Sequence, residues 1–442
     1  MTLGVPTRPL VFAEIIAVGS ELLVPPRLDT NSLFITVVLN RLGIEVRAKS
    51  VVADRREDVA AVLRGALERV DLVVMCGGLG PTDDDLTRDA VASLLGLPMA
   101  EDQAVLDRLV TRFASRGRVM PEVNRRQALV PAGAEVLPNP NGTAPGLWIE
   151  REGRIVILLP GPPSELEPMF GRVAAERIAP RAGGRKLCRK VLSLCGRTES
   201  EFEQIVFPTY GRWLGEALPI ATTILTAAAQ IELHLSVHAE TESIGMARLD
   251  EAAAQVAAVV GDDLFSVDGW PIERVVGEAL RRRGWRIAVA ESCTGGLISS
   301  RLTDVAGSSD YVLANAVCYS NGSKTSWLGV PAALIEERGA VSEDVAEAMA
   351  QGVVQKAGAE VGVGVTGIAG PSGGSEHKPV GTVVIAAVSP EARIVRTFRF
   401  PGDRIRVKQF AGQMALDMVR RLVTGAKPGE AFVARERVGA VR

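Results

Sequence analysis

The sequence predicts an α/β protein in which two three-layer α/β domains flank a small α+β module. Two observations predict the outer domains: short apolar runs alternate with helix-length segments over the first 180 residues, and this alternation returns after Trp270-Pro271. A third observation separates the middle, where two strand-like runs follow one another near 221–238 without a helix between them. Such a succession requires an antiparallel pair. The chain has 442 residues, which is more than one core usually serves.

The elements of the first domain follow from this alternation. We expect helix 101–116 and a polar, Pro/Gly-rich stretch over 131–147 to form an insertion over one edge of its sheet. The remaining elements are strands 13–19, 45–52, 71–77 and 154–160, and helices 30–42, 56–69, 85–95 and 164–177.

The middle module and the third domain are assigned in the same way. The middle module should contain strand 186–194, helix 199–207, the strand pair 221–238 and an Ala-rich helix 243–260. The third domain should contain helices 271–283, 295–304, 342–357 and 404–424, and strands 286–290, 311–319, 361–366, 380–388 and 393–399. We therefore place the domains at 1–180, 181–268 and 269–425, with a loose tail over 426–442.

Composition favours a cytoplasmic protein that binds small molecules. The 50 basic and 52 acidic residues nearly cancel, which removes the electrostatic argument for nucleic-acid or membrane binding. The apolar run within residues 1–19 is interrupted by Glu14 and lacks the features of a signal peptide. No run of 18 apolar residues is present. We expect small-molecule ligands, no nucleic-acid partner and no membrane.

Cysteine and histidine patterns give no metal site. The five cysteines form no C-x-x-C pair, which is typical of reduced thiols. His234 and His238 have the spacing of a metal pair on a helix, but the apolar residues around them alternate with polar ones. This alternation puts both histidines on the polar face of a strand.

The most informative segment is Glu291-Ser292-Cys293-Thr294-Gly295-Gly296, which follows a short apolar strand and precedes a helix. The first N–H groups of that helix should point toward Ser292 and Thr294, where they would stabilise an oxyanion or a phosphate. Cys293 is a rival nucleophile, with His377 as the only histidine of this domain. A third interpretation makes Ser292 and Thr294 helix caps and the glycines turn residues.

A second glycine turn follows strand 71–77. The free N–H groups of this turn, within residues 77–87, could cradle phosphate. The carboxylates that follow the glycines could then hold a divalent cation of unspecified identity. The alternative is ordinary capping of the helix that follows.

The third domain resembles the nicotinamide mononucleotide deamidase domain of the CinA family over about 270–424. The motifs AESCTGG, TGIAGP and KPVGTV carry this resemblance. It implies hydrolysis of nicotinamide mononucleotide to nicotinate mononucleotide and ammonia without a cofactor. It also implies Ser292 as nucleophile, Lys324 as base, Ser309 as an auxiliary hydroxyl and Arg404 in an assisting role. The chain departs from the family at residues 321–324, which read Asn-Gly-Ser-Lys where an acidic-alanine pair commonly precedes the lysine.

A lysine acts as a base only when its pKa is lowered, by burial or by a nearby cation such as Arg404. The helix after Ser292 should supply oxyanion donors. We expect Thr366 and Gly367 to hold substrate phosphate or ribose. The full set of expected substrate contacts is Thr294, Gly295, Gly296, Thr366, Gly367 and Lys378.

The first domain resembles the molybdopterin-binding-like domain of CinA proteins. The segments GSELL, DTNS, GGLGPTDDDLT, NGTAPG and LPGPP carry this resemblance. It implies a metal-dependent ADP-ribose pyrophosphatase site with Asp84 and Asp85 as the carboxylates that hold the metal, and with Gly78, Gly80 and Thr82 on the phosphate. Val24-Pro25-Pro26-Arg27 replaces the glycine-containing loop usual after GSELL, and its prolines stiffen a segment near the pocket. A degenerate pocket that only binds nucleotide is therefore an alternative.

The middle module resembles the KH-type segment of CinA proteins but has no G-x-x-G loop. We therefore expect a spacer or dimer-forming role for it, within a homodimer, and no RNA binding. A remaining alternative for the whole chain is a non-catalytic nucleotide-binding adaptor or competence-linked regulator.

Overall fold

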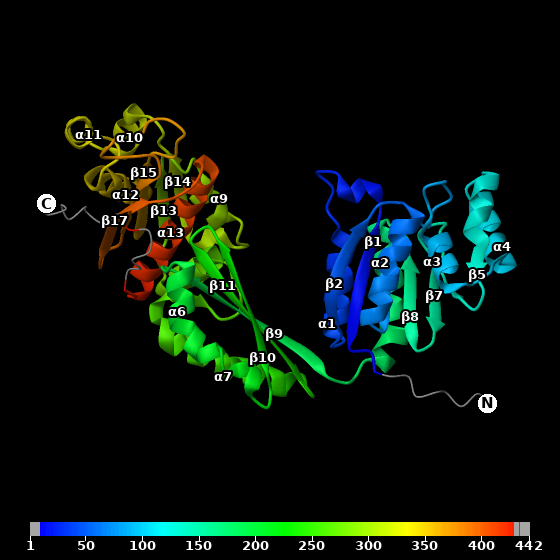
Figure 1. Ribbon diagram of the computed structural model, residues 1–442. Helices are drawn as coiled ribbons and strands as arrows, with labels where there is room; N and C mark the ends of the chain where they lie inside the picture. Colours follow the sequence, from blue (N-terminus) through cyan, green and yellow to red (C-terminus); the bar gives the residue numbers. More distant parts are fainter. Residues whose placement is uncertain (1–8, 428–432, 434–442) are drawn as a thin grey trace. The chain divides into compact units, whose positions relative to one another are not determined.

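The computed structural model describes residues 9–427 and residue 433, and its chain divides into two units. One unit contains the residues up to Cys188 together with His238–Gly245, and the other contains Arg189–Val237 together with the residues from Met246 onward. Most of the middle module therefore groups with the third domain (Figure 1). Most of the expected tail 426–442 lies outside the described residues.

The first unit is built on a six-stranded sheet with the order β2-β1-β3-β8-β7-β6. The first four strands of this order are parallel and the last two are antiparallel. All five residues of β3 are buried, as a central parallel strand requires. The strands are β1 Phe12–Val18, β2 Glu45–Val52, β3 Leu72–Cys76, β6 Glu135–Leu137, β7 Gly146–Arg151 and β8 Arg154–Leu159.

Helices cover both faces of this sheet, which confirms the three-layer prediction. One apolar core joins Ile15 and Ile157 of the sheet to α1 and α5, and a second core joins Ile16 and Val156 to α2, α3 and α4. The helices are α1 Thr30–Arg41, α2 Arg56–Arg69, α3 Thr87–Leu95, α4 Gln103–Ala114 and α5 Pro163–Val173.

The structure differs from the sequence prediction over 131–147, where an irregular insertion was expected. Strands β6 and β7 lie within or beside this stretch, and a separate pair is formed by β4, Met99–Glu101, and β5, Leu129–Pro131. Leu147, Trp148 and Ile149 are buried. These strands are too short, and the turns between them too rich in Pro and Gly, to show a periodicity.

The middle module has the expected α+β order. Its sheet runs β10-β11-β9-β12, and β10 pairs with β11 in an antiparallel register. Every second residue of β11 is buried, and His234 lies on the other, partly exposed side, which confirms the strand assignment. The KH-type assignment stays a prediction. The elements are β9 Lys186–Cys195, α6 Glu199–Tyr210, β10 Ile220–Ala227, β11 Gln230–Ala239, α7 Glu242–Val260 and β12 Leu264–Ser266.

The third domain has a five-stranded sheet with the order β14-β13-β15-β16-β17. β13 is parallel to β14 and β15, whereas β16 and β17 continue the sheet in antiparallel fashion. One large core packs α8, α9 and α13 on one face, and a smaller core packs α10, α11 and α12 on the other. The strands are β13 Ile287–Glu291, β14 Val312–Val317, β15 Val361–Gly367, β16 Thr382–Val388 and β17 Arg393–Arg399. The helices are α8 Ile272–Arg283, α9 Leu297–Thr303, α10 Asn321–Leu328, α11 Ala332–Arg338, α12 Glu343–Ala357 and α13 Arg404–Thr424.

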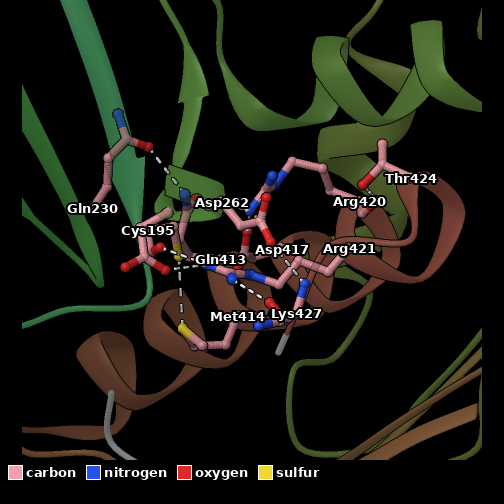
Figure 2. Close-up of polar contacts among 11 residues, drawn as sticks. Cys195, Gln230, Asp262, Gln413, Met414, Asp417, Arg420, Arg421, Thr424 and Lys427 are labelled. Carbon is pink, nitrogen blue, oxygen red and sulfur yellow. Dashed lines mark hydrogen bonds and ion pairs between the residues drawn. The ribbon is translucent and has the colours of Figure 1, made fainter. Parts of the chain in front are cut away.

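A buried ionic network joins α13 to the middle module. Figure 2 shows Asp417, Arg420 and Arg421 on α13 close to Cys195. Arg421 donates to the Asp417 carboxylate at 2.7 Å, to Asp263 at 2.8 Å and to the carbonyl of Cys195 at 2.8 Å. Arg420 donates to the other oxygen of Asp417 at 2.6 Å. Asp417 is 1% exposed, so its charge is held entirely by the two arginines.

Across residues 9–427, no helix combines the length and the apolar character that a membrane crossing needs.

Candidate active site

The topology brings Ser292 and Lys324 to the same edge of the third-domain sheet. Ser292 follows β13, and Lys324 lies on α10, the helix that follows β14. Because β13 and β14 are parallel neighbours, the residues that follow the two strands lie at the same edge of the sheet. Lys324 Nζ lies 3.1 Å from Ser292 Oγ, and both residues are buried, at 1% and 7% exposure.

The surroundings of Lys324 suit a neutral amine. Besides Ser292 Oγ, its Nζ contacts the carbonyl oxygens of Cys318 at 3.0 Å and Tyr319 at 3.2 Å. A neutral amine has two N–H groups and one lone pair. The two carbonyls can accept both N–H groups, which leaves the lone pair to accept the Ser292 hydroxyl. Burial lowers the pKa of Lys324 from its ordinary value, which favours this uncharged state.

Arg404 lies at this site but does not act as expected on Lys324. Its guanidinium donates to the Gly370 carbonyl at 2.9 Å and to the Tyr319 hydroxyl at 2.8 Å. Burial, and not the charge of Arg404, lowers the pKa of Lys324. Arg404 instead holds Tyr319, whose side chain is 59% exposed. Sequence reasoning gave no role to Tyr319, although it lies two residues after the end of β14.

The N-terminus of α9 is occupied by Glu291, which corrects the expectation of free donors there. The Glu291 carboxylate is fully buried and accepts hydrogen bonds from the amides of Gly296, Ile298 and Ser299 at 2.8 to 3.2 Å. It also accepts the Ser299 hydroxyl at 2.6 Å. A carboxylate at a helix N-terminus neutralises the positive end of the helix dipole. Glu291 therefore takes the donors that an oxyanion or a phosphate would have used.

The other residues of the turn between β13 and α9 have structural roles or are buried. Gly295 and Gly296 adopt φ of +63° and +95°, a left-handed conformation that strains other residues. The turn therefore requires both glycines, as the structural alternative supposed. Thr294 is fully buried, and its hydroxyl oxygen has no hydrogen-bond partner among the residues that the structure describes. A contact of this buried hydroxyl with substrate stays a prediction.

Three other residues that were expected to contact substrate make hydrogen bonds or packing contacts within the protein. Thr366 donates its hydroxyl to the Ala340 carbonyl at 2.8 Å, and Lys378 donates to the carbonyls of Arg338 and Val341 at 3.2 and 2.7 Å. A Cβ on Gly367 would lie 2.8 Å from a methyl carbon of a β16 valine, so close packing of β15 on β16 explains this glycine. Thr366 and Lys378 thus hold the connection between α11 and α12. Their role in binding substrate stays a prediction.

The structure does not bring Ser309 to this site within one chain. Ser309 is exposed and precedes β14, near Tyr311, whose carbonyl accepts the amide of Ile287 at the start of β13. Ser292 follows the opposite end of β13. Residues that precede parallel strands and residues that follow them lie at opposite edges of the sheet. For a strand of the length of β14, these two edges are about 20 Å apart. Within one chain, the Ser309 hydroxyl therefore lies too far from Ser292 for the auxiliary role that was expected.

The Cys293–His377 alternative lacks a thiolate. Burial raises the pKa of Cys293 to about 12, so its thiol stays protonated at neutral pH. His377 is exposed in the loop that precedes Lys378. No hydrogen bond between the two residues occurs among the described side-chain contacts. Ser292 is the nucleophile that the geometry favours.

The first unit contains a cavity of about 610 Å³ at the carboxyl ends of its parallel strands. Gly78, Gly80, Asp84 and Asp85 line it as expected, whereas Thr82 does not. Six carboxylate side chains line this cavity, with a single basic residue, Arg27, from the proline-containing loop. The carboxylates are those of Glu21, Asp29, Asp54, Asp84, Asp85 and Glu165.

Asp85 stabilises the turn beside this cavity and does not cap α3, at whose start no side-chain capping hydrogen bond forms. The Asp85 carboxylate accepts the amide and the hydroxyl of Thr82 at 2.9 and 2.5 Å. Arg126, which sequence reasoning did not single out, donates to the Thr82 carbonyl and to Asp83. Within residues 9–427, no group of three His, Cys, Asp or Glu side chains is arranged to hold a metal ion. A divalent cation here would take most of its ligands from water and substrate phosphates, as Mg²⁺ commonly does.

Family models match both outer domains of the chain. The model of the CinA C-terminal domain matches residues 270–423, and that of a probable molybdopterin binding domain matches residues 14–180. A CinA-like protein of Koribacter versatilis is 45% identical over 415 residues, which cover 93% of this chain and 99% of that protein. A putative competence-damage inducible protein of Symbiobacterium thermophilum is 43% identical over 431 residues, covering 94% and 99%.

Among solved structures, the crystal structure of the protein CinA from Thermoplasma acidophilum is 34% identical, with a TM-score of 0.36. The match covers 38% of this chain and 98% of that one. The assignment of this chain to a family depends on the two relatives named above, because they are well above 30% identical to it over nearly the whole of both chains. The protein described here belongs to the CinA family.

Proposed function

We propose that this protein hydrolyses the carboxamide of nicotinamide mononucleotide to nicotinate mononucleotide and ammonia, with Ser292 as nucleophile and Lys324 as base. The observation that carries the proposal is the buried contact of 3.1 Å between Lys324 Nζ and Ser292 Oγ. The two carbonyls that accept from the same Nζ direct its lone pair toward the serine. A serine activated by an adjacent base is the arrangement used for acyl transfer.

The reaction would proceed through an ester. Lys324 removes the proton of Ser292, whose oxygen attacks the carboxamide carbon, and the same lysine then gives the proton to the departing ammonia. Water attacks the resulting ester with Lys324 again as base, and nicotinate mononucleotide leaves. Because Glu291 engages the amides of Gly296, Ile298 and Ser299, we assign the oxyanion contact to the backbone amides of Cys293 and Thr294, which lie next to Ser292 along the chain.

This mechanism predicts how turnover depends on pH. The base is active only when Lys324 is uncharged, and burial shifts its pKa downward. The value of kcat/KM should rise with pH through the lowered pKa and reach a plateau below the ordinary lysine value of about 10.4. A pH profile of ammonia release tests this. Turnover that still rises steeply at the ordinary lysine pKa would contradict an uncharged Lys324.

The first-unit cavity supports a second candidate function, metal-dependent cleavage of the ADP-ribose pyrophosphate. The glycine turn and the carboxylates of Asp84 and Asp85 lie in one cavity large enough for a nucleotide. A diphosphate would be repelled by this acidic lining unless a divalent cation came with it. Asp84, which is exposed on the turn, and Asp85 are the residues that would hold such a cation.

A chelator should separate the two activities. With both substrates offered to the same preparation, a chelator should stop AMP release from ADP-ribose and leave ammonia release unchanged, because the Ser292–Lys324 reaction needs no metal. Both products can be followed by chromatography. Loss of ammonia release on chelation would refute the Ser-Lys mechanism, and nucleotide binding without either product would favour the adaptor alternative.

A further inference from the structure

A second cavity of the first unit, of about 550 Å³, is lined by α4 and by the loop of residues 138–145. This volume is in the range of small-molecule sites. The same loop contributes to the larger cavity described above, and Thr143 lines both cavities. We refer to the larger one as the carboxylate cavity. The smaller one is the arginine cavity, because Arg108, Arg112 and Arg172 are in its lining.

Hydrogen bonds hold the loop that forms one wall of the arginine cavity. The side chain of Asn139 accepts the amides of Asn141 and Gly142 at 3.0 and 2.8 Å, which closes the loop on itself. Asn139 also donates to the Glu165 carboxylate at 2.7 Å, and Asn141 donates to the Ser164 carbonyl at 2.7 Å. Both bonds attach the loop to the start of α5. A ligand therefore meets a wall that is already formed, which lowers the entropic cost of binding.

The arginine cavity is opposite in charge to the carboxylate cavity. Its lining contains three guanidinium groups and one carboxylate, that of Asp107. Arg172 is paired with Glu176 at 3.0 Å. Arg108 and Arg112 form no ion pair with any carboxylate of residues 9–427, and their i,i+4 spacing puts them on one face of α4. Two neighbouring cations in this cavity are therefore left without a counter-charge from the protein.

Arg112 has a buried donor that the protein does not use. Its Nη1 donates to the Pro140 carbonyl at 3.0 Å, which fixes the side chain against the loop. Its Nε is buried and has no hydrogen-bond partner among the residues that the structure describes. A buried N–H group without an acceptor destabilises a protein, so such groups commonly mark a ligand or an ion. The Nε and Nη2 edge of a guanidinium matches two oxygens of one anion, and this edge of Arg112 is the one that the loop leaves free.

We propose that the arginine cavity binds a phosphate monoester, with its phosphate held by Arg108 and Arg112. A dianionic phosphate matches two unpaired cations in both charge and hydrogen-bonding geometry. The organic group would pack on the apolar part of the lining, which includes Val105, Leu109 and Pro145. A nucleoside monophosphate has both parts, because its flat base packs on apolar side chains and on guanidinium groups. The site does not depend on either proposed reaction.

The two cavities should respond differently to divalent cations. The carboxylate cavity repels a phosphate unless a metal ion accompanies it, whereas the arginine cavity supplies positive charge of its own. Binding of AMP in the presence of a chelator therefore excludes the carboxylate cavity. Isothermal titration calorimetry of the full-length protein at low ionic strength measures this binding and the number of AMP sites per chain.

Arginine variants locate the site. The double variant of Arg108→Gln and Arg112→Gln should lose one AMP site per chain. Arg108→Gln alone should weaken that site by about 10-fold or more, because it removes a charge-assisted hydrogen bond. Arg108 is exposed and bonds only to the Ala104 carbonyl of its own helix, so this variant keeps the loop and the fold. The matched control is the double variant of Arg116→Gln and Arg118→Gln, which removes two exposed charges just after α4 and outside the cavity. Its AMP binding should be unchanged.

Adenosine and inorganic phosphate test the two parts of the ligand. Adenosine should not bind, and phosphate should bind at the same site more weakly than AMP. Three outcomes would overturn the site: no binding of millimolar AMP in the chelator, an unchanged number of AMP sites in the double variant of Arg108 and Arg112, or an equal loss in the control variant. Equal affinities for phosphate and AMP would refute the contact between the organic group and the apolar lining.

Discussion

Ser292→Ala is expected to lower the rate of ammonia release from nicotinamide mononucleotide by about 10⁴-fold or more, because this variant lacks the nucleophile of the proposed reaction. Lys324→Met should have a comparable effect, since it removes the base and keeps the volume of a side chain that is 1% exposed. Steady-state ammonia assays measure both. Turnover near that of the unmodified protein in either variant would exclude the Ser-Lys pair.

Two controls separate chemistry from folding. Cys293→Ala should retain most of the turnover, because burial raises the pKa of that thiol to about 12 and keeps it unreactive. Ser300→Ala, an exposed serine on α9, should leave turnover unchanged. Near-ultraviolet circular dichroism of all four variants reports whether the third domain keeps its packing. A large loss of turnover in Cys293→Ala alone would shift the assignment to the thiol.

The second large effect is on stability. Asp417→Asn should lower the free energy of unfolding of the second unit by about 3 kcal/mol or more, because two buried arginine charges would lose their shared carboxylate. A control with the same i,i+3 spacing is Glu278→Gln, which affects the more exposed pair of Glu278 and Arg281. That variant should lose less than about 1 kcal/mol.

Urea unfolding followed by tryptophan fluorescence measures both losses. If Asp417→Asn lost no more than Glu278→Gln, the network of Figure 2 would not be the interaction that holds α13 to the middle module.

The resemblance to the CinA family predicted the pair of Ser292 and Lys324, and the structure explains their juxtaposition because both residues follow strands that are parallel neighbours. The same rule could have excluded Ser309, since it precedes β14 and must lie at the other edge. Helices α10 and α11 were not predicted. The α10 segment NGSKTSWL is mostly polar and begins with a capping box at Ser320, so its helical character depends on the cap and on a few buried residues.

The roles of Glu291 and Arg404 could not be predicted from sequence. Glu291 ends a fully buried strand, and only the three-dimensional turn shows that its carboxylate folds back onto the helix that follows. Arg404 was expected beside Lys324, but its guanidinium is held by Gly370 and Tyr319 instead. Which partner a side chain binds depends on differences of a few ångströms in three dimensions. The spacing of residues along the sequence does not give these distances.

Glu291 also decides how a mononucleotide could orient itself. With the Glu291 carboxylate at the beginning of α9, this end of the helix repels a phosphate and does not attract it. If the protein acts on the proposed substrate, we expect the 5′-phosphate to face the cations at the start of α13, where Lys408 approaches Gly295. The ribose and the pyridine ring would follow from that direction, and the carboxamide would enter last, toward Ser292.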